Sequence, residues 1–429
     1  MVAGVAIVSS SGGSPSVTDP ACAPRETIVQ VHYEDFGPTT LVITRPCGDA
    51  PDKPYVVFAS YLGLSDGDYF TGPEPARAVL TPRDSHHFLF AWLARALARQ
   101  GIASVRYDPI AVRSRPRDGR AFVGARIVEE DLLRVQRADF SGLLEQVVSR
   151  ADELLGRSAR TPVVFVGHSG GAFTVGDYLE KAHERATQTA QAARPFGFVG
   201  LSPAVSDATG ILETNWRYWV RKTSSCLTLS SRDACLSQLK SVSLYPVVFH
   251  DPSLRGRIEL IFSQSPDSTT LVNRLDSELS RRARDKERAE RAHKDGLALL
   301  EGRYAFQQSL FHAMAFRAPS AGPLSCHTQA AALVLGLEDM LLDASQEARA
   351  WTQACGRAED VTLLAHLGHS LGPDPYVGPP SLQALELVAR SIESVATRLT
   401  GSPLTHRPSS NTSPPASPNS SPPSTGTHR

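Results

Sequence analysis

Two serines lie in the pattern Gly-x-Ser-x-Gly, which places a nucleophilic serine on a sharp turn between a strand and a helix. Ser169 is the centre of Gly-His-Ser-Gly-Gly, and Ser370 is the centre of Gly-His-Ser-Leu-Gly. A serine hydroxyl is a poor nucleophile at neutral pH, so it needs a base within hydrogen-bonding reach and a third group that orients the base. The pattern therefore indicates attack on a carbonyl carbon, at one of the two serines or at neither.

Ser169 meets the mechanical requirements of such a turn. The apolar run VVFVG precedes it, glycines at positions 167, 170 and 171 surround it, and no proline interrupts about twenty residues that follow. A helix can therefore begin directly after Ser169 and aim its first N–H groups at a developing oxyanion. Ser370 is followed by prolines at positions 373, 375, 379 and 380, so no helix can begin there. We predict Ser169 as the nucleophile and the N–H of Gly170 as one oxyanion donor.

The second motif then matters for its histidine. His369 ends the last strand-like run, VTLLAHLGH, and comes after Ser169 in the chain order serine, acid, histidine. We predict His369 as the general base. His366 falls inside the expected strand and is interpreted as a packing residue. His86, His87 and His168 are interpreted as surface or supporting residues rather than bases.

The acid has more than one candidate. Asp339 follows the apolar run AAALVLG and precedes His369 by 30 residues, an interval that fits one helix and one strand. Asp267 follows RIELIFSQSP and would require about a hundred residues between adjacent strands. We favour Asp339, with Asp267 and then Glu338 as alternatives. Either aspartate can also cap the helix that follows it, and that role does not exclude catalysis.

Composition excludes several classes of function. The chain has 429 residues, of which 41% are hydrophobic, and its 44 basic residues balance 44 acidic ones. A balanced charge gives no overall field toward nucleic acid or an anionic membrane. No run approaches the eighteen or so apolar residues of a membrane span. The first residues, MVAGVAIVSSSGGSPS, lack the basic region of a signal peptide, and the compartment stays open, as does the oligomeric state.

The six cysteines allow two interpretations. Three pairs are neighbours in sequence and can form disulfides in an oxidising compartment: Cys22 with Cys47, Cys226 with Cys235, and Cys326 with Cys355. In a chain of this length we favour reduced, structural thiols. No Cys-x-x-Cys spacing indicates a metal site, and the chemistry above requires neither a metal nor an organic cofactor.

Strand-like and helix-like stretches alternate along most of the chain, which predicts an α/β fold with a mostly parallel sheet and helices on both faces. Residues 1–25 and 401–429 are rich in Ser, Pro, Gly, Thr or Asn, and we expect disordered tails there. The core is expected in two parts, 26–207 with the nucleophile and 326–400 with the acid and the histidine.

The regularity lapses over residues 208–325, which we interpret as a large, mainly helical insertion that caps the carboxyl edge of the sheet. It contains the strand-like run RIELIFS and a helical run, 273–296, in which eight basic and six acidic residues alternate, typical of a solvated helix. The aromatic residues Trp216, Tyr218 and Trp219 are candidates for an acyl pocket, with ordinary packing as the alternative.

With these residues in place, the chain resembles the α/β-hydrolase superfamily, and within it the serine-aminopeptidase-like and acyl-esterase-like hydrolases, over about residues 26–400. The strings VVFASYLGLSDGD, ARALARQGIA, SVRYDPIAVRS, GLEDMLL and LAHLGHSL are similar to the motifs of that superfamily, in the same order. The resemblance implies a second oxyanion donor at the backbone of Tyr61 or Leu62. Tyr61 departs from the usual glycine, and PIAVRS departs from the usual Arg-Gly-x-Gly-x-Ser.

These features together lead us to expect an esterase-type serine hydrolase with a small-molecule acyl substrate. The same site would also suit a peptidase, a thioesterase or an acyltransferase, because a triad does not encode the leaving group. A binding protein that keeps the fold without catalysis is the alternative from another class.

Overall fold

The computed structural model describes the chain in segments that carry the sheet and most helices. The described residues are 23–59, 88–117, 120–128, 131, 135, 137–189, 194–205, 208–241, 252–283, 326, 328–339, 342–373 and 379–401. The expected tails lie outside them, apart from a few residues at their inner ends. Within the described residues, no helix combines the length and the apolar composition that crossing a membrane requires.

An eight-stranded sheet forms the centre of the molecule, with the strand order β1-β2-β4-β3-β7-β8-β9-β10. The pairs β1–β2 and β2–β4 are antiparallel, and the remaining pairs, from β4 to β10, are parallel. The strands are β1 (Arg25–Val31), β2 (Thr39–Arg45), β3 (Tyr55–Ala59), β4 (Ala103–Tyr107), β7 (Val163–His168), β8 (Phe196–Leu201), β9 (Ala330–Gly336) and β10 (Val361–Leu364). The carboxyl ends of the parallel strands therefore meet at one edge of the sheet.

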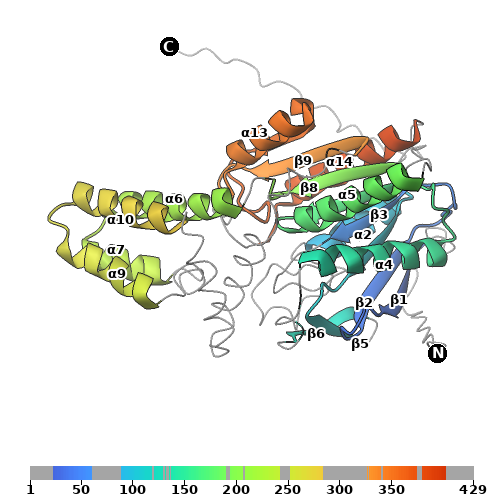
Figure 1. Ribbon diagram of the computed structural model, residues 1–429, viewed down its shortest axis with the longest axis horizontal. Coiled ribbons are helices and arrows are strands. Elements are labelled where there is room, and N and C mark those ends of the chain that lie inside the picture. Colours follow the sequence, from blue (N-terminus) through green and yellow to red (C-terminus); the bar gives the residue numbers. More distant parts are fainter. Residues whose placement is uncertain are drawn as a thin grey trace, which may run out of the picture.

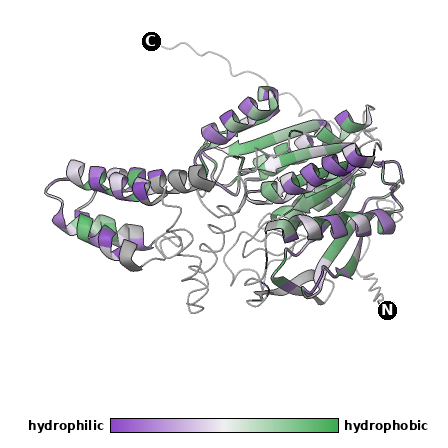
Figure 2. Ribbon diagram, viewed as in Figure 1, coloured by the Kyte–Doolittle hydropathy of each residue, from purple (hydrophilic) through white to green (hydrophobic). Residues whose placement is uncertain are grey.

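Helices cover both faces of the sheet, as the alternation of strands and helices predicts (Figure 1). These helices are α2 (Leu89–Arg99), α4 (Arg137–Leu155), α5 (Gly171–Thr189), α13 (Ala344–Cys355) and α14 (Leu382–Thr400). Successive strand residues enter two different cores: Val57 and Phe165 pack with α4 and α5, whereas Val56 and Val164 pack with α2 and α14. The apolar colour of the central strands in Figure 2 reflects this burial on both faces.

Two elements leave the regular pattern. A hairpin of β5 (Val112–Arg117) and β6 (Arg120–Ile127) follows β4. Between β8 and β9, the helices α6 (Ala208–Leu227), α7 (Arg232–Ser241), α9 (Pro252–Gln264) and α10 (Ser268–Ala283) form an arm that projects from the sheet (Figure 1). The described part of the insertion is thus helical, whereas its predicted role as a cap stays a prediction.

The strand-like interpretation of RIELIFS is wrong, because these residues belong to helix α9. Among the described side chains of α9, Ile258, Ile261 and Phe262 are buried. Their spacing of three and four residues is that of one helical face, whereas a strand would bury every second residue. The β-branched residues suggested a strand, but packing against the other helices of the arm decided the conformation.

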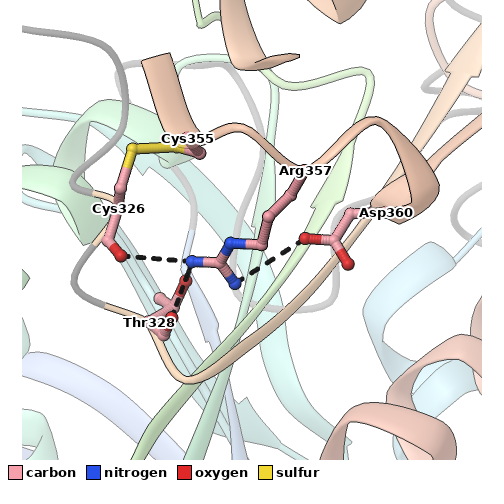
Figure 3. The surroundings of a disulfide bond; sticks show 5 residues. All are labelled: Cys326, Thr328, Cys355, Arg357 and Asp360. Atoms are coloured by element: carbon pink, nitrogen blue, oxygen red, sulfur yellow. Dashed lines mark hydrogen bonds and ion pairs between the residues drawn. A yellow bond between two sulfur atoms is a disulfide. The ribbon is translucent and has the colours of Figure 1, made fainter. Parts of the chain in front are cut away.

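Cysteine pairing also differs from the favoured interpretation. Cys326 and Cys355 form a disulfide that joins the chain just before β9 to the end of α13. Arg357 lies beside this bond and donates to the carbonyl oxygens of Cys326 (3.1 Å) and Thr328 (2.7 Å), as Figure 3 shows. Cys47 is disulfide-bonded as well, and Cys22 lies outside the described residues. The prediction of six reduced thiols is therefore wrong.

Cys226 and Cys235 are buried thiols in the arm, on α6 and α7. Burial, followed by a hydrogen bond with Cys226, raises the pKa of the Cys235 thiol to about 12. Cys235 Sγ also lies 3.8 Å from the carbonyl oxygen of Thr223. A protonated, buried thiol is a weak nucleophile, because the thiolate is the reactive form.

We expect two thiols when the folded, unreduced protein is denatured and titrated with a thiol reagent, because the disulfide of Cys47 and the Cys326–Cys355 bond account for four of the six cysteines. The same protein after full reduction should give six. Six thiols without reduction would contradict both disulfides, and none would mean that Cys226 and Cys235 are also joined.

Candidate active site

Ser169 lies on the turn between the end of β7 and the start of α5. Its backbone has a φ of 51°, in the left-handed region that a side chain with a Cβ rarely adopts. Gly167 relieves crowding at the turn, since a Cβ there would lie 3.1 Å from the backbone nitrogen of Ala172, closer than most Cβ contacts. The strained turn leaves the Ser169 side chain partly exposed beyond the end of the strand.

The neighbouring strand holds this turn through its backbone. Ser169 N–H donates to the carbonyl of Leu201 at 3.0 Å, and Ala204 N–H donates to the carbonyl of Ser169 at 3.2 Å. The chain between them turns at Ser202, which also has a positive φ, of 39°. Gly170 separates Ser169 from the first residue of α5, where the leading N–H groups of a helix have no partner inside the helix.

Asp339 and His369 lie in direct contact. His369 Nδ1 is 2.8 Å from Asp339 Oδ2, and the two residues are 3% and 5% exposed. The other carboxylate oxygen of Asp339 accepts the N–H of Leu342 at 3.0 Å. Since a carboxylate only accepts, the imidazole carries its proton on Nδ1, which leaves Nε2 as the basic nitrogen when the ring is neutral.

Parallel pairing brings the acid and the histidine together, because Asp339 follows β9 and His369 follows the adjacent β10. The two turns pack tightly: a Cβ on Gly336 would lie 2.2 Å from the carbonyl oxygen of Leu367. Glu338 N–H also donates to that carbonyl, at 2.9 Å. Glycine is therefore required at the end of β9.

The fold is that of the α/β-hydrolases. The deciding observations are the strained serine turn between a strand and a helix of a mostly parallel sheet, followed along the chain by an acid after β9 and a histidine after β10. Helices on both faces and an insertion after β8 complete this α/β-hydrolase fold.

No protein-family model matches the chain, and no curated protein matches it. Solved structures that resemble it include VinJ, at 13% identity over 86% of this chain and 98% of that chain, with a TM-score of 0.41. An esterase from the hyperthermophilic archaeon Pyrobaculum calidifontis matches at 14% identity over 87% and 84%, with a TM-score of 0.41. A brefeldin A esterase, a bacterial homologue of human hormone-sensitive lipase, matches at 16% over 90% and 81%, with a TM-score of 0.36. The sheet order and the turns after β7, β9 and β10 define the fold of this chain.

The two alternative acids, Asp267 and Glu338, are exposed to solvent. Asp267 is exposed and caps helix α10, where it accepts the N–H (2.7 Å) and the hydroxyl (2.9 Å) of Thr270. These hydrogen bonds lower the pKa of the Asp267 carboxyl. Glu338 is exposed on the turn after β9. Of the three candidate acids, Asp339 is the one whose contact with His369 is seen.

The other predicted residues have different outcomes. Tyr61 and Leu62 lie outside the described residues, as do the side chains of Trp216 and Tyr218. Trp219 is 1% exposed on α6, which packs against α10, so its burial fits the packing interpretation.

His366 is not a packing residue inside a strand, because it is exposed on the turn after β10 with a φ of 59°. Strand β10 ends at Leu364, five residues before His369, where the sequence predicted the end of the strand.

Ser370 does not lie on a second nucleophile turn. It is fully buried, and α14, the next helix along the described chain, begins only at Leu382, beyond the prolines. Gly372 instead brings the chain back against Pro379, since a Cβ on Gly372 would lie 2.1 Å from the carbonyl oxygen of Pro379. No helix begins at Ser370, as the prolines predict, and the turn after β10 holds His369 instead.

Sequence reasoning missed two contacts that support the turns. The ring of His168 lies with Nε2 3.0 Å from the backbone carbonyl oxygen of His369. The carboxylate of Glu347, on α13, accepts the N–H of Val205 at 2.6 Å and so holds the chain that leaves β8. Both are contacts between a side chain and a distant backbone, and no spacing in the sequence signals them.

No group of His, Cys, Asp and Glu that would hold a metal ion occurs among the described residues.

Burial, and then the charge of His369, lower the pKa of His168 to about 3. The unfolded chain binds this proton below about pH 6.5, whereas the native protein excludes it, so His168 lowers the stability progressively from about pH 6.5 toward pH 3. We expect the free energy of unfolding of a His168→Gln variant to fall less steeply with decreasing pH, by up to about 1.4 kcal/mol per pH unit.

Urea unfolding of both proteins from pH 7 to pH 4 measures this difference in slope. Parallel curves would mean that His168 is protonated in the native protein, or is accessible to water, contrary to its burial.

Proposed function

We propose that this protein is a serine hydrolase that cleaves a carboxylic ester through a covalent acyl-enzyme. The observation that carries the proposal is the buried contact between His369 Nδ1 and Asp339 Oδ2, at the same edge of the sheet as the strained Ser169 turn. A histidine whose Nδ1–H is held by a carboxylate presents a basic Nε2, which is what activation of a serine hydroxyl requires.

In the proposed mechanism, the Ser169 hydroxyl oxygen bonds to the substrate carbonyl carbon while its proton moves to His369 Nε2. The resulting tetrahedral intermediate collapses as the bond to the leaving alcohol breaks, and the His369 imidazolium returns the proton to that alcohol. Water then attacks the acyl-enzyme with the same histidine as base, which releases the carboxylic acid and restores Ser169. Asp339 stays ionised and stabilises the imidazolium in both steps.

The oxyanion of each intermediate needs hydrogen-bond donors that are already in place. The N–H of Gly170, at the start of α5, is one proposed donor, and its position at a helix N-terminus adds a favourable dipole. The second proposed donor is the backbone of Tyr61 or Leu62, after β3. Loss of one such donor costs about 100- to 1000-fold in rate in other serine hydrolases.

We expect a fluorophosphonate probe to label the folded protein at Ser169, and mass spectrometry of the labelled peptide should locate the adduct there. Ser169→Ala should take up no probe and should hydrolyse p-nitrophenyl esters at least about 1000-fold more slowly. Ser370→Ala is the matched control, because it removes the serine of the second motif. Labelling that persists in Ser169→Ala would contradict the assignment of the nucleophile.

The acid is tested by two substitutions of the same chemical kind. Asp339→Asn should lower kcat by about 1000- to 10,000-fold, because an amide no longer fixes the tautomer of His369 or stabilises its charge. Asp267→Asn should leave kcat within about twofold, since Asn also caps a helix well. Thermal unfolding of both variants controls for folding. A large loss in Asp267→Asn with little loss in Asp339→Asn would reverse the assignment.

The class of acyl substrate can be determined by comparing hydrolysis rates for different leaving groups. A panel of p-nitrophenyl esters of increasing chain length, together with aminoacyl anilides and acyl thioesters, gives kcat/KM for each leaving group. The proposal expects the highest values among the esters. Highest values for the anilides would indicate a peptidase, and highest values for the thioesters a thioesterase.

A further inference from the structure

His168 joins the nucleophile turn to the backbone of the histidine. It is the last residue of β7 and directly precedes Ser169. Its Nε2 lies 3.0 Å from the backbone carbonyl oxygen of His369, and the two rings meet edge to face, with centroids 4.9 Å apart. The His168 residue is 2% exposed, so the contact is shielded from water.

The direction of this hydrogen bond follows from its acceptor. A carbonyl oxygen can only accept, so His168 Nε2 must carry the hydrogen. Burial, and then the charge of His369, lower the pKa of His168, so the ring stays neutral at pH values well below the usual pKa of histidine. Among the described residues, the titratable group that faces His168 is His369, whose Nδ1 is held by Asp339. A neutral donor at this position adds no repulsion when His369 becomes an imidazolium.

His369 is thus held at two points from two different strands. Asp339, after β9, holds the ring through Nδ1. His168, at the end of β7, holds the backbone through the carbonyl. The first contact sets the orientation of the imidazole, whereas the second sets the distance between the histidine turn and the serine turn. Because His168 and Ser169 are adjacent in the chain, any shift of the His369 backbone away from β7 must break this hydrogen bond.

We propose that His168 is a positioning residue, whose Nε2–H holds the His369 backbone against the serine turn and so keeps the base within reach of the nucleophile. This inference rests on the proposed function of Ser169 and His369. A misplacement of about 1 Å between reacting groups can cost about 100-fold in rate.

Two substitutions separate the donor from the bulk of the side chain. His168→Gln keeps an N–H donor at about the position of Nε2, whereas His168→Leu fills a similar volume without one. We expect His168→Leu to lower kcat about 10- to 100-fold with KM nearly unchanged, and to slow fluorophosphonate labelling by the same factor. His168→Gln should recover most of this loss. Equal losses in both variants, or full activity in a folded His168→Leu variant, would overturn the proposal.

A second background distinguishes positioning from a general structural effect. If His168 acts through His369, its substitution should have little further effect on the residual rate of a His369→Ala variant, because the two changes remove the same function. If the His168 substitution lowers the rate by the same factor in the unmodified protein and in His369→Ala, the loss comes from a structural change that does not act through His369.

A measurement on the unmodified protein does not depend on how the variants fold. In two-dimensional ¹H–¹⁵N spectra of histidine-labelled protein, His168 should be the Nε2–H tautomer and should stay neutral at pH 5. The Nδ1–H tautomer would overturn the proposal, because its Nε2 cannot donate. If Ser169→Ala hydrolyses esters as fast as the unmodified protein, the proposed function fails instead, and the spectra still decide whether the hydrogen bond exists.

Discussion

The hydrogen bond between the Asp339 carboxylate and the His369 ring requires two turns from adjacent parallel strands to approach more closely than side chains allow. The approach is possible because Gly336 has no Cβ, which would otherwise meet the carbonyl oxygen of Leu367 at 2.2 Å. Burial then strengthens the contact, since the effective dielectric constant falls as water is excluded. A glycine at the end of one strand therefore determines whether the acid and the histidine meet at all.

The serine turn is subject to the same kind of constraint. Its left-handed backbone is a strained conformation, which persists only where the surroundings hold it. The surroundings here are the close approach of α5 over Gly167 and the two backbone hydrogen bonds with the chain at the end of β8. Three strands, β7, β8 and β9, and the turn after β10 thus contribute to one compact group of backbone turns. The side chains of the proposed triad lie on this group of turns, and the strands set their spacing.

Helix α13 connects this site to the rest of the second half of the core. Its buried Glu347 holds the N–H of Val205, next to the residue that donates to Ser169. At its other end, the Cys326–Cys355 disulfide fixes α13 to the chain that enters β9 (Figure 3). The helix therefore links the strand that precedes Asp339 to the loop that supports the Ser169 turn. The helices of the arm, by contrast, have a small core of their own and project from the sheet (Figure 1).

The sequence by itself determined the fold class and predicted the serine turn, because these depend on local signals: glycines where backbones approach, prolines that prevent a helix after Ser370, and apolar runs at the spacing of strands. It favoured Asp339 as the partner of His369 but left Asp267 and Glu338 as alternatives, and the tertiary structure shows the contact with Asp339. It favoured a strand where α9 forms and a packed His366 where an exposed turn forms, since the neighbours that decide each conformation are distant in the chain. It also favoured reduced cysteines, although Cys326 and Cys355 are joined. The contacts of His168 with the His369 backbone and of Glu347 with Val205 were decided by tertiary structure alone. A side chain that binds a backbone group can do so with any residue type opposite it, so such contacts leave no pattern in the sequence.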